Sequence, residues 1–229
     1  MADAPLQIGL LLFPRLTQLD MTGPFEVFAR LPNTKVHLVW KSREPVTSDV
    51  GLQILPTTTL AECPDLDVVC VPGGPGMNAL LEDEEVLAFL RRQGAQARYV
   101  TSVCTGALVL GAAGLLKGYK AATHWASMDV LPLLGAEPVH ERVVVDRNRI
   151  TGGGVTAGLD FGLVVVAKLY GERMAQLIQL GEEYDPAPPF NAGSPRSAPP
   201  DVVTQLRGLM AKSVDERMAI AKRVAATFS

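Results

Sequence analysis

Residues 98–116, RYVTSVCTGALVLGAAGLL, place Cys104 between a predicted strand (98–103) and a predicted helix of small residues (105–116). A residue on such a sharp strand-to-helix turn projects its side chain from the top of a sheet, as in a nucleophile elbow. The positive end of the following helix is expected to favour the thiolate of Cys104 over the thiol. Cys104 is therefore predicted to be a reactive residue.

The chain on both sides of this turn alternates apolar strands with helical patterns. Strands are predicted over 7–13, 35–41 and 67–71, with a strand or hairpin arm at 48–55 and a hairpin over 140–154. Helices are predicted over 23–31, starting at Gly23-Pro24, and over 78–97, 155–171 and 172–184. This alternation predicts one α/β domain over residues 1–229, with a mainly parallel sheet sandwiched by helices.

The end of the chain has a different composition. Residues 185–200 hold six prolines among sixteen residues, so they cannot continue a helix or a strand ladder, and we expect an extended strap. Residues 201–229 are predicted to form one amphipathic helix that packs on the same domain or on a dimer partner.

Composition limits the class of protein. Of the 229 residues, 48% are hydrophobic and 20% are charged, which excludes a disordered or fibrous chain. The net charge of −3 argues against a nucleic-acid partner. The N-terminus lacks the positive charge of a signal peptide, and no apolar run reaches the ~18–20 residues of a membrane helix. With three cysteines, an odd and sparse number, we expect a cytoplasmic protein without membrane contact.

Asp20 is the best candidate partner for the Cys104 thiol. It follows the strand over 7–13, so it belongs to the same edge of the sheet as the end of the strand over 98–103. It could instead cap the helix that opens at residues 22–24. The other two cysteines are predicted to be bystanders, Cys63 in a loop and Cys70 inside a strand.

A cysteine–histidine hydrolase would need a histidine near the thiol. His37 and His140 fall in predicted strands, where a structural role is expected. His124 is a candidate neighbour of the site, although a structural role is the simpler interpretation.

The turn after the strand over 67–71 is rich in glycine. Gly74-x-Gly76-x-x-Ala79 matches a dinucleotide-binding pattern only loosely, because no acid follows at the end of the next strand. Gly73 and Gly74 are instead predicted to bring the backbone close to a reacting centre and to point N–H groups at it. A tight turn without a further role is the alternative.

Together these segments resemble the PfpI-type superfamily, which also contains the Parkinson-associated deglycase, and within it the isocyanide hydratases. The resemblance is carried by residues 11–28, 67–76, 99–118, 122–125, 150–163 and 182–195, and so covers nearly the whole chain. It implies a flavodoxin-like fold, a homodimer, no cofactor and no metal. The implied activity is a lyase-type hydration that adds water to a small-molecule isocyanide, R–N≡C, and gives an N-substituted formamide.

The resemblance also implies roles for individual residues. Cys104 would be the nucleophile that forms a thioimidate, Asp20 the general acid and base, and Thr105 their neighbour. The turn from Gly153 to Val155 would offer a backbone N–H to the thiolate, and Tyr184 would line the pocket near the strap.

Three alternatives remain open at this stage. A glyoxalase or deglycase would use the same elbow cysteine, although Asp20 in place of a glutamate and Thr105 after the cysteine favour it less. Peptidase activity is not among these alternatives, because peptidase-like members carry histidine where this chain has Thr105. The sensor domain of a transcription regulator has a similar opening, but only 29 residues follow Pro200, too few for paired DNA-binding units. A cysteine redox sensor could coexist with catalysis.

Overall fold

A seven-stranded sheet forms the centre of the protein, whose computed structural model describes residues 4–228. The strands follow the order β10-β11-β7-β6-β1-β2-β5. They are β1 (Leu6–Leu11), β2 (Thr34–Trp40), β5 (Thr58–Thr59), β6 (Val68–Val71), β7 (Tyr99–Val103), β10 (Val143–Asp146) and β11 (Arg149–Gly152). Every neighbouring pair is parallel except β10 and β11. The predicted mainly parallel sheet is confirmed.

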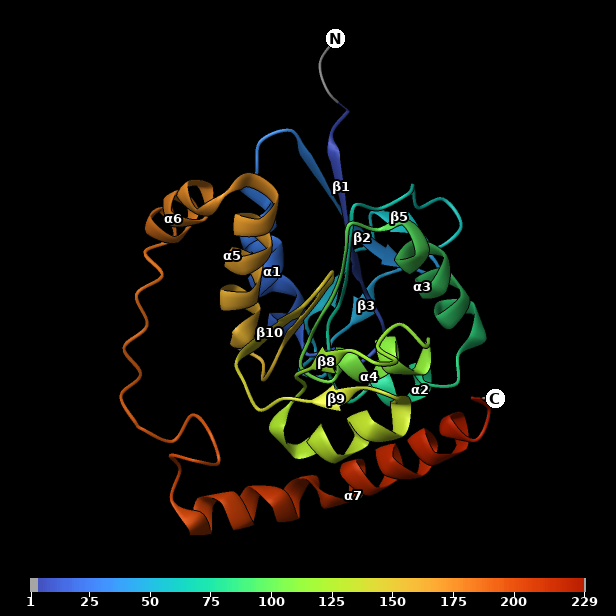
Figure 1. Ribbon diagram of the computed structural model, residues 1–229, viewed down its shortest axis with the longest axis vertical. Helices are drawn as coiled ribbons and strands as arrows, with labels where there is room; N and C mark the ends of the chain where they lie inside the picture. Colours follow the sequence, from blue (N-terminus) through green and yellow to red (C-terminus); the bar gives the residue numbers. More distant parts are fainter. Residues whose placement is uncertain (1–3, 229) are drawn as a thin grey trace.

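Helices cover both faces of this sheet (Figure 1). On one side lie α1 (Gln18–Ala29), α5 (Ala157–Tyr170) and α6 (Glu172–Gly181), and on the other α2 (Met77–Leu80), α3 (Glu84–Gln96) and α4 (Gly106–Ala112). Phe28 of α1 meets Phe161 of α5 edge-on, with 6.1 Å between the ring centres, and both side chains are fully buried. The flavodoxin-like sandwich predicted from the sequence is confirmed.

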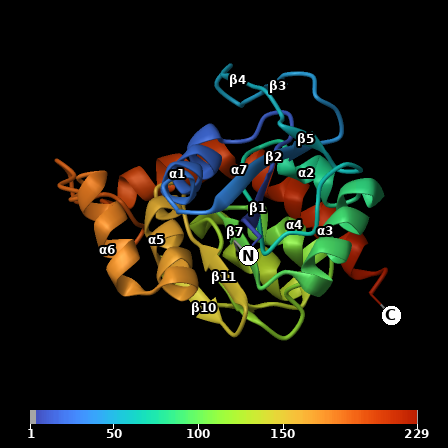
Figure 2. The same ribbon diagram turned by 90° about the horizontal axis from the view of Figure 1, so that it is seen from above.

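Short elements surround the main sheet. β3 (Val46–Thr47) and β4 (Gln53–Ile54) form the predicted hairpin arm, which projects beyond the edge formed by β2 and β5 (Figure 2). A 3₁₀ helix, η1 (Trp125–Leu134), and the parallel pair β8 (Lys120–Ala121) and β9 (Glu137–Pro138) were not predicted. The 3₁₀ helix has three residues per turn and contains Pro132, so it lacks the α-helical spacing of apolar residues.

The C-terminal part consists of an irregular connection followed by one long helix. Residues 182–199 connect α6 to α7 (Pro200–Ala225) without helix or strand, and Pro200 begins the helix, where a missing N–H costs nothing. α7 packs along η1 and against α4 of the same chain (Figure 1). Among residues 4–228, no helix is long and apolar enough to cross a membrane.

Three predicted helix boundaries were wrong. α1 begins at Gln18, so Gly23 and Pro24 lie inside it, packed closely against α5. The helix predicted over 78–97 is two helices, because the Asp83 side chain caps α3 by accepting a hydrogen bond from the Val86 N–H. α4 ends at Ala112, just before Gly114 turns the chain with a φ of 78°.

Candidate active site

Four neighbouring parallel strands bring the site together. β11, β7, β6 and β1 lie side by side. The carboxyl ends of the first three lead into the turns that carry Gly153, Cys104 and Gly73, and that of β1 leads to the start of α1, which carries Asp20. These segments, far apart in sequence, therefore meet at one edge of the sheet, where ligands bind in open α/β folds.

Cys104 sits on a strained turn that its neighbours hold in place. Its φ is 55°, in the left-handed region that residues other than glycine seldom adopt. Its N–H donates to the Gly152 carbonyl at 3.1 Å, and its own carbonyl accepts from the Thr123 hydroxyl at 2.8 Å. A β-carbon on Gly106 would lie 2.0 Å from the Val71 carbonyl oxygen, so the close approach of α4 to β6 requires glycine. The turn has the geometry of a nucleophile elbow.

Asp20 is fully buried beside this elbow. Its Oδ2 accepts from the Gly73 N–H at 2.9 Å, while Oδ1 is buried without a hydrogen-bond partner within residues 4–228. The carboxyl and the Cys104 thiol lie close enough for each group to shift the pKa of the other. The alternative that Asp20 caps the helix is wrong. The residue lies in the first turn of α1, and its carboxyl accepts a hydrogen bond from Gly73 in the turn after β6. Burial raises the pKa of Asp20 to about 7, although the bonds from Gly73 and Cys104 lower it.

The thiol of Cys104 is buried too, with 6% of its surface exposed. Burial raises the pKa of Cys104 well above its ordinary value, and the negative charge of Asp20 raises it further, whereas the Thr105 N–H lowers it. The expectation that the helix would favour the thiolate is therefore wrong for the resting site. Desolvation outweighs the N-terminus of the short α4, so the thiol needs a base, and Asp20 is placed to be that base.

The pKa of Asp20 has a consequence for stability. A folded-state pKa of about 7 against an ordinary value of 3.8 means that the folded protein holds a proton which the unfolded chain loses between these pH values. Stability is therefore lost as the pH rises from 4 to 7, by up to about 4 kcal/mol from this group alone.

Asp20→Asn has no such proton to lose. The stability of the variant relative to wild type should therefore rise between pH 5 and pH 8, as measured by urea unfolding at both values. A difference that does not change with pH would show that the carboxyl is ionised at both values.

Thr105, Gly73 and Gly74 surround the same pair. The Thr105 hydroxyl oxygen accepts from the Gly74 N–H at 3.1 Å. A β-carbon on Gly73 would lie 2.6 Å from the N and Oγ1 of Thr105 and 2.8 Å from Asp20, so this turn approaches both residues closely. The two glycine N–H groups thus donate to Asp20 and to Thr105. That they also support a substrate stays a prediction.

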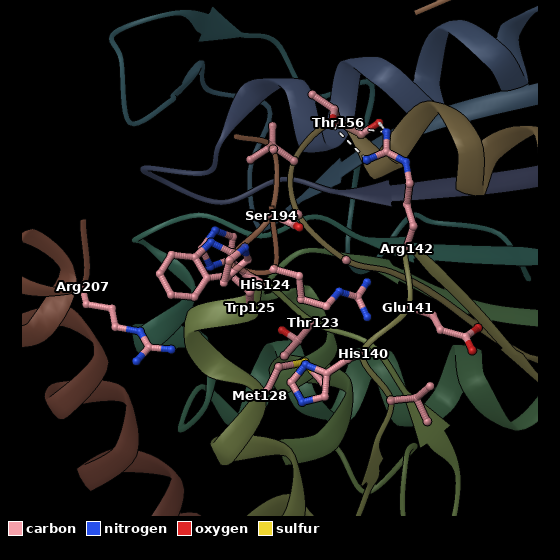
Figure 3. A pocket seen from close by; sticks show the side chains of 17 residues that line it. Thr123, His124, Trp125, Met128, His140, Glu141, Arg142, Thr156, Ser194 and Arg207 are labelled. Carbon is pink, nitrogen blue, oxygen red and sulfur yellow. Dashed lines mark hydrogen bonds between the residues drawn. The ribbon is translucent and has the colours of Figure 1, made fainter. Parts of the chain in front are cut away.

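A cavity of about 610 Å³ lies next to the elbow. Figure 3 shows side chains that line it. Thr123 and Gly153, which flank Cys104, line it, and so does Val155, although Cys104 itself does not. The strap contributes residues 193–196, and α7 contributes Arg207, which reaches toward the Trp125 ring. The strap is therefore a wall of the cavity next to the thiol.

The turn after β11 carries N–H groups without an acceptor. The Gly153 N–H donates to the Arg142 carbonyl at 2.9 Å, whereas the N–H groups of Gly154 and Val155 have no acceptor within residues 4–228. The predicted contact between an N–H of this turn and the sulfur stays a prediction.

Tyr184 does not line the cavity that lies next to the elbow. It lines a second cavity with Leu159 and Glu182, and its hydroxyl donates to Asp160 at 3.0 Å. Asp160 also accepts from Arg142 at 2.7 Å, and Arg142 lines the first cavity. Asp160 and Arg142 thus connect Tyr184 to the predicted pocket.

Histidines contribute more to the cavity than the sequence indicated. His124 and His140 both line it, while His37 is buried in β2 and bonds Gln7. Burial lowers the pKa of His124 to about 4, so its ring is neutral, and its Nδ1 accepts from the Ala126 N–H. Sequence reasoning missed Trp125, Met128, Arg142 and the strap residues, because nothing local distinguishes a lining side chain from a surface one.

An elbow cysteine paired with a buried carboxyl at the carboxyl edge of a flavodoxin-like sheet defines a class of α/β thiol proteins. The chain belongs to the DJ-1/PfpI family, whose model matches residues 7–168. It is 60% identical to an isonitrile hydratase of Pseudomonas putida, over 96% of this chain and 97% of that protein. The predicted relationship to the PfpI-type superfamily, and within it to an isocyanide (isonitrile) hydratase, is confirmed.

Two further relatives show how widely the fold is used. A ThiJ/PfpI family protein from Pseudomonas syringae, of known crystal structure, superimposes with a TM-score of 0.93 and 52% identity over 95% of this chain and 91% of that one. The HTH-type transcriptional regulator GbdR of Pseudomonas aeruginosa is 31% identical over 76% of this chain, but that match spans only 49% of the regulator. The fold alone thus does not decide between catalysis and sensing.

Proposed function

We propose that the protein is an isocyanide hydratase that adds water to R–N≡C and releases an N-substituted formamide. The observation that carries the proposal is the buried pair of Cys104 and Asp20, a nucleophile beside a carboxyl whose pKa of about 7 suits both proton donation and acceptance. The similarity to the Pseudomonas putida isonitrile hydratase, which extends over nearly all of both chains, supports the same substrate class.

The first half of the reaction forms a covalent intermediate. The Asp20 carboxylate takes the thiol proton as Sγ of Cys104 attacks the terminal, electrophilic carbon of the isocyanide. Asp20 then delivers that proton to the same carbon. The product is a thioimidate, R–N=CH–S–Cys104, in which the chain has gained one whole isocyanide and Asp20 is again a carboxylate.

The second half consumes water. Asp20 removes a proton from a water molecule, whose oxygen adds to the thioimidate carbon, and passes this proton to the nitrogen. Collapse of the tetrahedral species breaks the C–S bond and forms the carbonyl of R–NH–CHO, and the hydroxyl proton passes by way of Asp20 to the sulfur, which leaves as the thiol. One water is consumed and no oxidant or reductant takes part.

Formamide formation from a simple aryl isocyanide tests the proposal. Wild-type protein should convert the isocyanide to one equivalent of the corresponding formamide, resolved by chromatography, faster than buffer alone. Methylglyoxal supplied in parallel should not be consumed at a comparable rate. A protein that turns over methylglyoxal and leaves the isocyanide untouched would point to the glyoxalase alternative instead.

The proposal includes a homodimer in the cytoplasm. Six large apolar side chains are exposed on α6, the strap and α7, namely Leu177, Leu180, Phe190, Val202, Leu206 and Leu209. Large exposed apolar side chains on three consecutive segments of the chain support a contact with another protein. A second copy of the chain is the occupant we propose, and all three cysteines are free, as in a reducing compartment.

Charge placed on this surface should separate the two copies. Leu209 is 77% exposed, and Leu209→Glu should shift the sedimentation coefficient from dimer to monomer. Val50, also 77% exposed but on the hairpin arm, provides the matched control, because Val50→Glu should leave the dimer intact. A wild-type protein that sediments as a monomer would refute the dimer.

A further inference from the structure

Arg217 of α7 is a buried cation without a carboxylate partner. Only 4% of the surface of this residue is exposed. The guanidinium donates to Ser127 Oγ at 2.6 Å, to Asn78 Oδ1 at 3.1 Å and to Ser213 Oγ at 3.4 Å, all of them neutral acceptors. None of the ion pairs formed within residues 4–228 includes it. A buried charge with neutral partners alone is costly to keep.

The two nearest acceptors of Arg217 belong to the segments that hold the elbow. Ser127 lies in η1, four residues after Thr123, whose hydroxyl donates to the Cys104 carbonyl. Asn78 lies in α2, four residues after Gly74, whose N–H donates to Thr105. Arg217 therefore connects the C-terminal helix to both sides of the turn that carries the thiol.

Arg217 lies within electrostatic reach of Cys104. Burial lowers the pKa of Arg217, and the negative charge that Cys104 can carry raises it. Asp20 on α1, His124 at the start of η1 and Arg217 on α7 are the titratable groups whose charges interact near the thiol. Five further charged or titratable side chains line the adjoining cavity, namely His140, Glu141, Arg142, Arg196 and Arg207. Since burial and the charge of Arg217 lower the pKa of His124 to about 4, the histidine is neutral, and Arg217 is the buried positive charge beside it.

We propose that Arg217 is a positioning residue whose buried positive charge stabilises negative charge on Sγ of Cys104, which makes the C-terminal helix an electrostatic part of the active site. Negative charge develops on the sulfur twice, when the thiol is deprotonated for attack and when the C–S bond breaks. A fixed charge in a dry site stabilises such states without reorganisation. The proposal rests on Cys104 as the nucleophile of the proposed function.

Alkylation of Cys104 by iodoacetamide as a function of pH tests this without any isocyanide. The peptide that contains Cys104 is quantified by mass spectrometry, so each cysteine is followed separately. In Arg217→Met the alkylation rate at pH 8 should fall about tenfold, because the pKa of the thiol should rise by about one unit. Arg217→Lys, which keeps the charge, should recover most of the rate, and kcat for hydration should fall in Arg217→Met with little change in KM.

Two controls separate charge from structure. Arg223 lies on the same helix and pairs with Glu82 at the surface, so Arg223→Met should leave Cys104 alkylation unchanged. Cys70 is fully buried in β6, and its alkylation in the same sample reports any opening of the fold. Should Arg217→Met unfold, Arg217→Gln removes the charge and keeps a donor for Ser127.

The proposal would be overturned if the alkylation rate of Cys104 depended on pH in the same way in wild type and in folded Arg217→Met or Arg217→Gln. Arg217 would then have a structural role alone. A shifted profile together with absent hydratase activity in wild type would instead retain the electrostatic role and reject the proposed function.

Discussion

Cys104→Ser is expected to abolish isocyanide hydration while the protein stays folded. A serine hydroxyl fits the elbow but is a far weaker nucleophile toward the isocyanide carbon than sulfur is, and Asp20 with a pKa of about 7 is too weak a base to activate it. Loss of the nucleophile should lower kcat by about 10⁴-fold or more. The measurement is formamide formation, with the unfolding midpoint recorded on the same preparation.

Cys63 offers the matched control for this substitution. It is half-buried in a loop, and burial raises the pKa of its thiol to about 11. Cys63→Ser should keep the wild-type rate. Turnover by Cys104→Ser at more than a tenth of the wild-type rate would remove the thiol from the reaction.

Asp20→Asn should be the second most damaging change. Asparagine keeps an acceptor for the Gly73 N–H and the volume of the side chain, but it can neither take the thiol proton nor deliver it. We expect kcat to fall by about 10²–10⁴-fold, the usual contribution of a positioned acid or base. Because Asp20 must be ionised to act first as a base, kcat/KM of wild type should rise with pH through about 7 and then level off.

Asp49 provides the control for this change. It bonds the Thr17 hydroxyl at 2.9 Å, and its negative charge raises the pKa of Asp20 slightly. Asp49→Asn should therefore keep the rate of wild type and move the pH midpoint downward. An Asp20→Asn enzyme with the wild-type rate and pH profile would return Asp20 to a structural role.

The sequence predicted the sheet and the elbow well because both depend on local pattern. Apolar strands in alternation with helices require a sandwiched parallel sheet, and the change from YVTSV to GALVLG marks the turn at Cys104. The start of α1 was misjudged because Gly23-Pro24 resembles a helix start, whereas packing of this pair against α5 holds it inside the helix.

The chemistry of the site was predicted only in part because it depends on tertiary contacts. Position on the sheet edge was enough to choose Asp20, but its bond to Gly73 joins residues 53 positions apart in the chain, and its burial depends on the folded structure. The helix next to Cys104 indicated a thiolate, and only the folded structure shows that burial reverses this. Arg217 lies in a helix with several other charged residues and carries no sequence signal that separates it from Arg223.

The covalent intermediate on Cys104 offers the most direct test of the account. Wild-type protein mixed with an aryl isocyanide is quenched in acid during turnover, digested and examined by mass spectrometry. The peptide that contains Cys104 should gain the mass of one isocyanide, and this adduct should form and decay as quickly as formamide appears. Formamide production without an adduct on Cys104, or with the adduct on another residue, would contradict the mechanism.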